Sequence, residues 1–337
     1  MGFNVIVPAA GIGTRLRPHT FTLPKVLLPV AGKPIIGHIL DKIVALKPDK
    51  LFIIVGYMGE KLRCYTSETY PDTDIVFVEQ EETKGLGHAI SLVDKLIDKN
   101  KPLLIMLGDT LVELDLSLML DEHYSALAVK EVDDPRRFGV VELDNGFIKR
   151  VIEKPEKPPS NLAIVGVYYF REASLLFEGL DHIIRNNITT KGEFQLTDAL
   201  QYMLDKGTEF IPRKIGKWFD CGRPETLLET NKALLEKEME QHHKNEKDYM
   251  IIPPVNIGKN VEIKESIIGP YVTIGDNAKI YHAIVSNSII HHHAEINNLI
   301  IENSIIGERA EVLGQMMSFS LSDNASVHFF NESLKEE

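Results

Sequence analysis

The sequence predicts an α/β domain with a mixed, mainly parallel sheet, followed by a triangular parallel β-helix. Two observations lead to this prediction. From residue 3 to about 110, short apolar runs alternate with amphipathic stretches, which is typical of parallel strands joined by crossover helices. After Pro254, large aliphatic residues recur every six positions, as in coils that stack their aliphatic side chains inside. A chain of 337 residues is long enough for two domains.

The first part of the chain contains apolar runs that we expect to be strands, separated by amphipathic stretches that we expect to be helices. The strand candidates are residues 3–8, 50–56, 74–79 and 102–107, and the helix candidates are 34–46, 58–67 and 85–98. Ligands of parallel sheets bind beyond the carboxyl ends of the strands. A glycine-rich loop follows the first strand and Asp109 follows the fourth, so both should lie at this edge of the sheet.

The middle of the chain has the pattern of β structure, after which helices return. The expected strands fall within residues 125–132, 138–154 and 161–170, and the expected helices are 171–186, 193–206 and 224 to about 246. Asn145-Gly146 is a strong signal for a two-residue hairpin inside the second stretch. Pro253-Pro254 marks a boundary after the last helix. We expect a first domain over 1–245, a linker over 246–254 and the β-helix over 255–330.

The six-residue repeat assigns the inward-facing positions of the β-helix. A single coil cannot bury its apolar face alone, so each coil should pack against neighbouring coils or against partners. The expected inward triplets recur every sixteen residues, with a partial turn before them and a further turn near the end: Ile257, Val261 and Ile263; Ile268, Ile274 and Ile280; Ile284, Ile290 and Ile296; Ile300, Ile306 and Val312; and Leu321, Ala325 and Val327.

Composition excludes several classes of protein. The net charge of −12 argues against a nucleic-acid surface and requires any cationic site to be local. Cys64 and Cys221 lie far apart, form no metal or disulfide pattern, and are expected to be half-buried small residues. The first residues lack the basic start and cleavage site of a signal peptide, and no apolar run approaches a membrane span. We expect a soluble cytoplasmic protein that contacts neither membrane nor nucleic acid.

The glycine-rich loop after the first strand predicts a site for the phosphates of a nucleotide. Glycines let backbone N–H groups approach an anion closely, because no Cβ blocks the way. The loop carries Arg15 and Arg17, and Lys25 follows ten residues after Arg15. Fixed cations beside such a loop suit a polyphosphate. The pattern GxxxxGK[ST] of a P-loop is absent, and no third glycine follows at dinucleotide-binding spacing.

The chemistry of several other polar residues can be interpreted without reference to a known family. Asp109 follows a buried parallel strand, where a carboxylate is rarely structural alone. The amide of Gln80 offers an acceptor and donors that match the edge of thymine or uracil, although guanine presents a similar pair. We expect His88 to be a first-turn helix residue rather than a catalytic base. His291, His292 and His293 are adjacent in sequence, and we expect them to be solvated rather than to form a metal cluster.

The run GxGTRLRP-x(5)-PK, from Gly11 to Lys25, resembles the motif of the sugar-1-phosphate nucleotidyltransferases. The resemblance extends over nearly the whole chain, because the tail is similar to the hexapeptide β-helix that long-form members append. The full layout is similar to the long form of the glucose-1-phosphate thymidylyltransferases. This resemblance implies a Rossmann-like nucleotidyltransferase domain followed by a left-handed parallel β-helix.

The resemblance also implies roles for individual residues. The phosphate loop and base site would use Ala10, Gly11, Gly13, Thr14, Arg15, Gln80 and Gly85. Asp109 and Asp220, the latter in a motif similar to WxDxGTPxxL, would hold Mg²⁺, although Asp220 could instead cap a helix. Arg15, Lys25, Asp109, Lys154 and Asp220 would be the catalytic set. The sugar phosphate would contact Lys25, Gly139, Glu153, Lys154, Val165, Glu193 and Trp218.

The implied reaction joins a nucleoside triphosphate and a hexose 1-phosphate into a nucleotide sugar and pyrophosphate. The overall resemblance implies dTTP with glucose 1-phosphate, and UTP is the close alternative because GLGHAI is also similar to uridylyltransferases. Two departures from the family pattern are Phe138, where many members have tyrosine, and Arg223, where threonine is usual. A bifunctional enzyme with acyltransferase activity in the tail and a non-catalytic regulatory homologue stay open. A homo-oligomer is expected.

Overall fold

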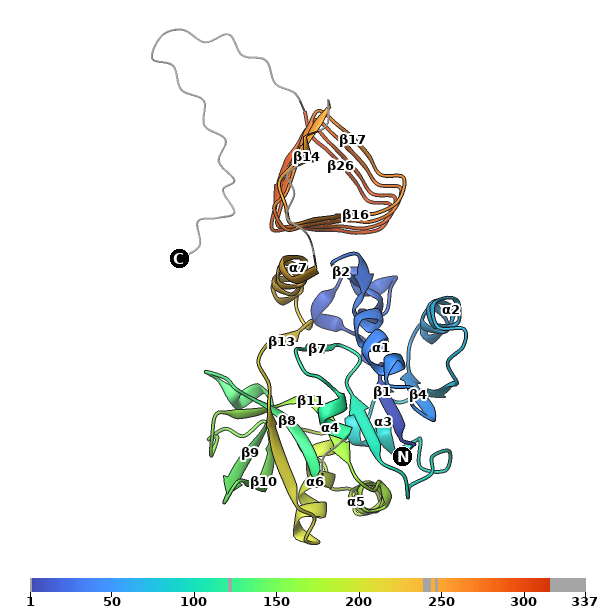
Figure 1. The fold of residues 1–337 in the computed structure, drawn as a ribbon, viewed down its shortest axis with the longest axis vertical. Coiled ribbons are helices and arrows are strands. Elements are labelled where there is room, and N and C mark those ends of the chain that lie inside the picture. Colours follow the sequence, from blue (N-terminus) through green and yellow to red (C-terminus); the bar gives the residue numbers. More distant parts are fainter. Residues whose placement is uncertain (1, 121–122, 239–243, 246–247, 316–337) are drawn as a thin grey trace.

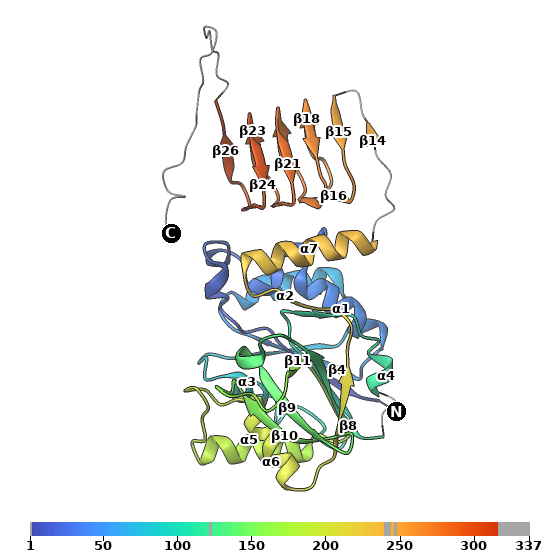
Figure 2. The same cartoon turned by 90° about the vertical axis from the view of Figure 1, so that its left-hand side faces the viewer.

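The computed structural model describes residues 2–120, 123–238, 244–245 and 248–315. It contains a layered α/β domain and, above it in Figure 1, a three-sided prism of parallel strands. The predicted fold class, a mixed and mainly parallel Rossmann-like domain followed by a left-handed β-helix, is therefore confirmed. The helix α7 lies between the two parts in both views (Figures 1 and 2).

The first half of the large sheet is parallel and contains all the strands predicted before residue 110. Strand β1 pairs on one side with β4, which pairs with β5, and on the other side with β6. These strands are β1 (Asn4–Pro8), β4 (Lys50–Val55), β5 (Ile75–Glu79) and β6 (Leu103–Met106). Their carboxyl ends share one edge of the sheet, which places Ala9 and Asp109 there.

The second half of the sheet joins the first through an antiparallel pair. Strand β11 (Leu162–Phe170) pairs antiparallel with β6, and the sheet continues through β9 (Gly139–Asp144) to β10 (Phe147–Glu153). Off this path, β8 (Ser125–Glu131) pairs with β11 and with β12 (Phe210–Lys214). The predicted Asn145-Gly146 turn joins β9 to β10, and both residues have positive φ, 50° and 87°, as a type I′ turn requires.

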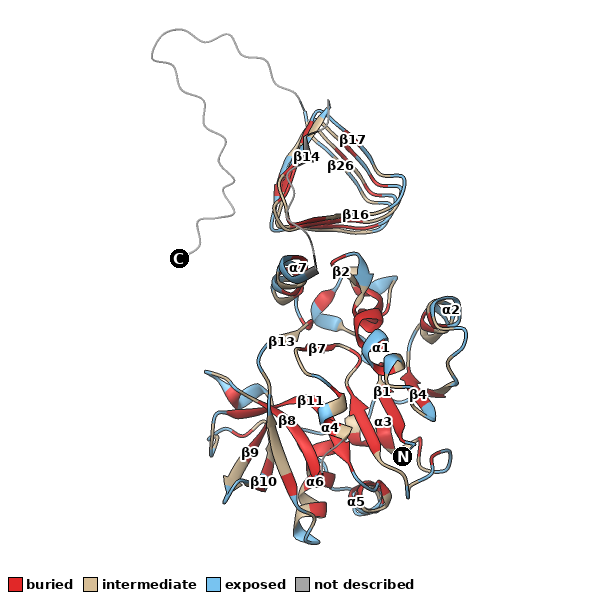
Figure 3. Ribbon diagram, in the orientation of Figure 1, coloured by how far each residue is buried: buried red, intermediate tan, exposed pale blue. Residues whose placement is uncertain are grey.

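Helices cover both faces of the sheet, and the alternation of side chains along the strands explains why. Val5 and Val7 pack with α1 on one face, while Ile6 packs with α3, α5 and α6 on the other. Figure 3 shows the resulting buried layer along the strands. The helices are α1 (Ile35–Ala45), α2 (Gly59–Thr69), α3 (Leu86–Ser91), α4 (Ser117–Leu120), α5 (Ser174–Arg185), α6 (Leu196–Asp205) and α7 (Pro224–Glu238).

Helix α3 was predicted but is shorter than expected, because it ends at Ser91, well before the predicted residue 98.

Several short elements have no counterpart among the sequence predictions. Single turns of 3-10 helix cover Thr14–Leu16, His19–Phe21, Lys25–Leu27 and Pro135–Arg137. The short strands are β2 (Pro29–Val30), β3 (Lys33–Pro34), β7 (Thr110–Val112) and β13 (Trp218–Asp220). They are too short to leave a periodic signal in the sequence.

The β-helix consists of stacked ladders that form its three sides (Figures 1 and 2), and all of their strand pairs are parallel except β14 with β15. Asparagines at the corners, such as Asn260, Asn277 and Asn303, adopt positive φ, which asparagine tolerates better than most residues. The first side contains β14 (Lys244–Asn245), β15 (Tyr249–Ile251), β18 (Ser266–Ile268), β21 (Ile284–Ser286) and β24 (Ile300–Glu302). The second contains β16 (Val255–Ile257), β19 (Val272–Ile274), β22 (Ile289–Ile290) and β25 (Ile305–Ile306). The third contains β17 (Glu262–Lys264), β20 (Lys279–Tyr281), β23 (Glu295–Asn297) and β26 (Glu311–Leu313).

The predicted triplets have the right register on two sides of the prism, and on the first side the register is right at Ile268 but wrong in the next two coils. Ile257, expected inside in an earlier partial turn, is 39% exposed. Ile284 and Ile300 were expected inside, but they are 42% and 77% exposed. Val285 and Ile301 are buried in their place and align with Ile268 on the inner face. The step from Ile280 to Val285 spans five residues rather than six. Because side chains alternate between faces, a shift of one residue moves Ile284 and Ile300 to the outside.

The β-helix begins within the interval that we expected to be a linker. Tyr249–Ile251 pairs with Ser266–Ile268, and Ile251 is buried with the β-helix core. At the other end, Leu321, Ala325 and Val327, with the rest of 316–330, lie outside the described residues. The proposed division into domains stays a prediction.

One outer face of the β-helix packs against the first domain. Asn256, Thr273, Ile289 and Ile305 follow one another as lateral neighbours on the second side. Ile289 belongs to the core of the first domain, and Ile305 packs against that core. Asn231 of α7 ties the parts together, because its Oδ1 accepts hydrogen bonds from the backbone N–H of Ala31 at 2.8 Å and from Thr273 Oγ1 at 2.6 Å.

We predict that Asn231→Ala weakens folding through this junction. The substitution leaves two buried donors without their acceptor, so the free energy of unfolding should fall by about 1–3 kcal/mol. Glu229→Ala, at an exposed position of the same helix, is the matched control and should change stability by less than about 0.5 kcal/mol. Urea denaturation measures both. Equal midpoints for the two variants would show that Asn231 contributes nothing to the junction.

Candidate functional site

A short antiparallel ladder places the two aspartates next to each other. In β13 and β7, Asp220 pairs with Thr110, and the N–H of Cys221 donates to the carbonyl of Asp109 at 3.4 Å. Asp109 and Asp220 therefore line the same cavity although they are 111 positions apart in the sequence. Asp220 is the last residue of β13, and the first turn of α7 is closed instead by Thr226, which bonds to the backbone of Arg223.

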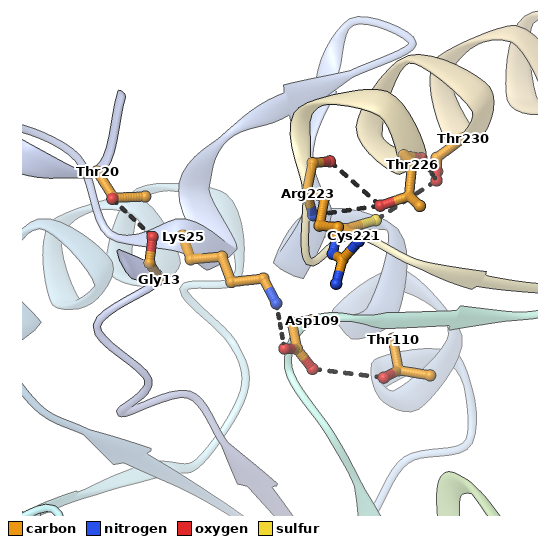
Figure 4. A network of polar contacts seen from close by, with 9 residues as sticks. All are labelled: Gly13, Thr20, Lys25, Asp109, Thr110, Cys221, Arg223, Thr226 and Thr230. Atoms are coloured by element: carbon orange, nitrogen blue, oxygen red, sulfur yellow. Dashed lines mark hydrogen bonds and ion pairs between the residues drawn. The ribbon is translucent and has the colours of Figure 1, made fainter. Parts of the chain in front are cut away.

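Lys25 is buried and forms an ion pair with Asp109. Its side chain reaches across from the glycine-rich segment, and Nζ lies 2.5 Å from Asp109 Oδ2 (Figure 4). The lysine is 6% exposed, whereas the aspartate side chain is 35% exposed. A charge so deeply buried needs a partner, because removal from water is costly without one. Lys25 is therefore not a solvated surface lysine.

The glycine-rich loop is held in shape by its own neighbours. Gly13 has φ of 69°, and a Cβ there would approach Lys25 Cβ to 2.9 Å and Thr20 Cγ2 to 3.0 Å. Thr20 is buried, and its hydroxyl donates to the carbonyl of Gly13 at 2.9 Å (Figure 4). Glycine is required at this position by both the backbone conformation and the lack of space. The loop presents Arg15 to the site from the 3-10 turn Thr14–Leu16.

The first of two cavities, about 340 Å³, contains the residues predicted for the sugar phosphate except Lys25, which lines the second cavity. Glu153 is anchored by Thr197, whose hydroxyl donates to Oε2 at 3.0 Å, and its Oε1 lies 3.2 Å from Lys154 Nζ. Glu193 accepts a hydrogen bond from Gln195 Nε2 at 3.0 Å. The lining includes Arg15, Asp109, Gly139, Glu153, Lys154, Val165, Glu193, Trp218 and Asp220.

The second cavity, about 290 Å³, contains residues predicted for the nucleotide base and phosphates. Gln80 is buried, and its Nε2 lies 3.4 Å from the carbonyl of Gly85 and 3.4 Å from His88 Nδ1. Gly85 has φ of 108°, and a Cβ there would clash with Phe194. His88 lies in the first turn of α3, as expected, and burial lowers its pKa. The lining includes Ala10, Gly11, Lys25, Gln80, Gly85, Asp109 and Glu193.

The two cavities adjoin, and the ion pair marks their junction. Leu86, Leu107, Asp109 and Glu193 belong to the walls of both. Arg15 lines the first cavity and Lys25 the second, so cations approach the junction from two directions. Gly13 and Thr14 line neither cavity and contribute through the shape of the loop. Two ligands could therefore lie end to end, with their charged groups between Arg15, Lys25 and Asp109.

Of the two positions where the sequence departs from the family pattern, Arg223 is hydrogen-bonded through its backbone to Thr226, and Phe138 lies in the wall of the first cavity. Phe138 packs edge-on against Trp218, with ring centroids 4.8 Å apart, in the wall of the first cavity. The Nε1 of Trp218 is buried without a partner among the described residues. Arg137, which the sequence did not single out, also lines this cavity. Tyr168 is a further wall residue, and burial raises the pKa of its phenol.

Two of the minor sequence expectations are wrong in part. His292 and His293 are exposed as expected, but His291 is 5% exposed and faces the first domain. Cys64 is exposed rather than half-buried, whereas Cys221 is fully buried directly behind Asp220.

Within the described ranges, no three His, Cys, Asp or Glu side chains form a group that could hold a metal ion. None of the helices in the described part of the chain is long and apolar enough to cross a membrane.

The fold combines an α/β domain that carries a two-part pocket, lined by Arg15, Lys25 and Lys154 together with carboxylates, and a β-helix that follows it. Residues 4–237 match the nucleotidyl transferase family, so the chain belongs to that family. The protein is 40% identical over 235 residues to the bifunctional protein GlmU of Methanocaldococcus jannaschii, covering 69% of this chain and 55% of the relative. The chain thus spans little more than half of that protein.

Other relatives and solved structures match this chain over nearly their whole length. The UTP–glucose-1-phosphate uridylyltransferase AglF of Haloferax volcanii is 36% identical over 243 residues, covering 69% of this chain and 97% of the relative. A UDP-glucose pyrophosphorylase solved with UDP-glucose superimposes with a TM-score of 0.61 at 29% identity, covering 71% of this chain and all of that chain. A putative glucose-1-phosphate thymidylyltransferase from Bacillus anthracis gives 0.60 at 25% identity, covering 71% and 97%.

We predict that Cys64 alone reacts with a thiol reagent in the folded protein. Burial raises the pKa of the Cys221 thiol to about 12, so almost no thiolate exists at pH 8 and the reagent has no access. Titration with a chromogenic disulfide should count one thiol per chain in buffer and two in denaturant. Cys64→Ser, the control, should abolish the native signal. Rapid native labelling in that variant would mean that the turn behind Asp220 opens readily.

Proposed function

We propose that this protein transfers a nucleotidyl group from a pyrimidine nucleoside triphosphate to a hexose 1-phosphate, releasing pyrophosphate. The observation that carries the proposal is the pair of adjoining cavities that meet at Lys25 and Asp109. The proposed pairing is dTTP with glucose 1-phosphate, and UTP is the alternative. The names of AglF and of the matched pyrophosphorylase favour a uridine nucleotide, and that of the Bacillus anthracis protein favours thymidine.

In this proposal the base enters the second cavity and the hexose enters the first. Gln80 and the backbone near Gly85 would read the edge of the base, since Nε2 of Gln80 already faces Gly85 and leaves its oxygen as an acceptor. Glu153 and Glu193 would accept hydrogen bonds from sugar hydroxyls. Their carboxylates are oriented by Thr197 and Gln195, which limits the conformational freedom lost on binding.

The reaction needs no general base, because the attacking phosphate oxygen of the hexose 1-phosphate is already an anion at neutral pH. That oxygen attacks the α-phosphorus, the bond from the α-phosphorus to the bridging oxygen breaks, and pyrophosphate leaves with both electrons. Lys25 and Lys154 would hold the reacting phosphates, and Arg15 would bind the leaving pyrophosphate. Catalysis then depends on alignment and on cations placed where negative charge develops.

Asp109 and Asp220 suit a magnesium ion. Both offer the hard carboxylate oxygens that Mg²⁺ prefers, and they line one cavity on paired strands. The remaining ligands would be substrate phosphates and water, since the described residues provide no group of three protein ligands. When bound, Mg²⁺ would neutralise charge on the phosphates of the triphosphate.

The proposal is tested by measuring pyrophosphate release with Mg²⁺ for dTTP, UTP, GTP, CTP and ATP against glucose, mannose, galactose, glucosamine and N-acetylglucosamine 1-phosphates. We expect activity with a pyrimidine triphosphate and glucose 1-phosphate. Lys25→Met and Asp109→Asn should each lower turnover by at least about a hundredfold, because each removes a charge placed at the reacting phosphates.

The exposed Lys95→Met variant is the control for a change of lysine to methionine and should retain full turnover. No release from folded wild-type protein with any substrate pair would refute the proposed activity. Near-normal turnover in Lys25→Met or Asp109→Asn would remove that residue from the catalytic set.

A further inference from the structure

The β-helix contacts the first domain at a second place, away from Asn231 and close to the glycine-rich loop. His291 lies just past β22, at the corner of the prism, and faces His19 of the 3-10 turn His19–Phe21. The two imidazole rings are stacked, with centroids 6.2 Å apart and an angle of 20° between their planes. His19 follows Arg15 by only four residues, so this contact touches the segment that carries the phosphate-binding arginine.

The contact between His291 and His19 lies inside the interface between the β-helix and the first domain. His291 is 5% exposed, and its Nε2 has no hydrogen-bonding partner among the described residues. The Nε2 atom is therefore buried without a hydrogen bond from the described residues to compensate for the loss of water, which costs stability. Burial lowers the pKa of His291 to about 4, so the ring is uncharged at neutral pH and does not repel His19. The uncharged ring of His291 therefore contributes to the contact through its stacking on His19.

A continuous set of contacts leads from His19 to the reaction centre. The neighbouring residue Thr20 is buried and donates to the carbonyl of Gly13. Gly13 packs directly against the stem of Lys25, where not even a Cβ would fit, and Lys25 pairs with Asp109 (Figure 4). The turn that His291 contacts is therefore the same turn that fixes the loop around the predicted phosphate site.

We propose that His291 is a positioning residue, through which the β-helix holds the glycine-rich loop and Arg15 in place for the triphosphate. The inference rests on the proposed function only for its kinetic consequences, because the contact acts on the loop with or without turnover. The β-helix thus contributes directly to nucleotide binding, in addition to any part that it has in assembly. The ring of His291 is needed for its flat shape, so phenylalanine should replace it.

The test compares His291→Ala, His291→Phe and His293→Asn in the full-length protein. His293 is an exposed neighbour with φ of 59°, a conformation that asparagine accepts, so His293→Asn is the matched control. In His291→Ala, KM for the triphosphate should rise about tenfold while KM for the hexose 1-phosphate changes by less than about twofold, as expected for a displaced binding loop. His291→Phe and His293→Asn should behave like wild type.

Hydrogen exchange provides a readout that does not need activity. Backbone amides of residues 11–21 should exchange faster in His291→Ala, while those of the β-helix and of α7 stay protected. His19→Ala, which removes the same contact from the other side, should reproduce the effect, and the double variant should add little to it. Unchanged exchange and an unchanged KM for the triphosphate in His291→Ala would overturn the inference. An inactive wild type whose loop still loosens in His291→Ala would refute the proposed function but leave the inference intact.

Discussion

The buried ion pair between Lys25 and Asp109 is the constraint on which the site depends. Lys25 comes from the segment after the glycine-rich loop, and Asp109 lies three residues beyond the end of the central strand β6. Neither charge can be removed without leaving the other unpaired in a partly buried place, which is strongly unfavourable. The pair therefore fixes the loop against the edge of the sheet. Both cavities open from that point, so the same interaction organises the fold and the proposed chemistry.

The β-helix and the first domain are parts of one continuous structure at this edge. Asn231 joins α7, the Ala31 backbone and Thr273 through hydrogen bonds, while Ile289 enters the core of the first domain. Along one outer face of the prism, the polar Asn256 and Thr273 are followed by the apolar Ile289 and Ile305. This arrangement orients the corner that carries His291, and it explains how a domain built from short repeated coils can influence a loop of the neighbouring domain.

Much of this arrangement follows from sequence patterns, and the failures have physical causes. The strands before residue 110 and the Asn145-Gly146 hairpin were predicted because periodicity and turn chemistry are local. Ile284 was placed on the wrong face, because a coil that loses one residue at a corner keeps its aliphatic character but changes its register. The burial of His291 depends on a partner 272 positions away in the chain, which no local pattern reports. The residue roles at the site stay predictions, although the structure brings most of them to two adjoining cavities.

The central claim is that the hexose phosphate attacks the nucleotide directly, with both ligands in place. It is tested most directly by following exchange of radiolabelled pyrophosphate into dTTP or UTP, with and without glucose 1-phosphate. Direct displacement predicts exchange only when the sugar phosphate is present, because no nucleotidyl group is carried by the protein itself. Exchange in the absence of any sugar phosphate would reveal a covalent nucleotidyl-protein intermediate and would contradict the account.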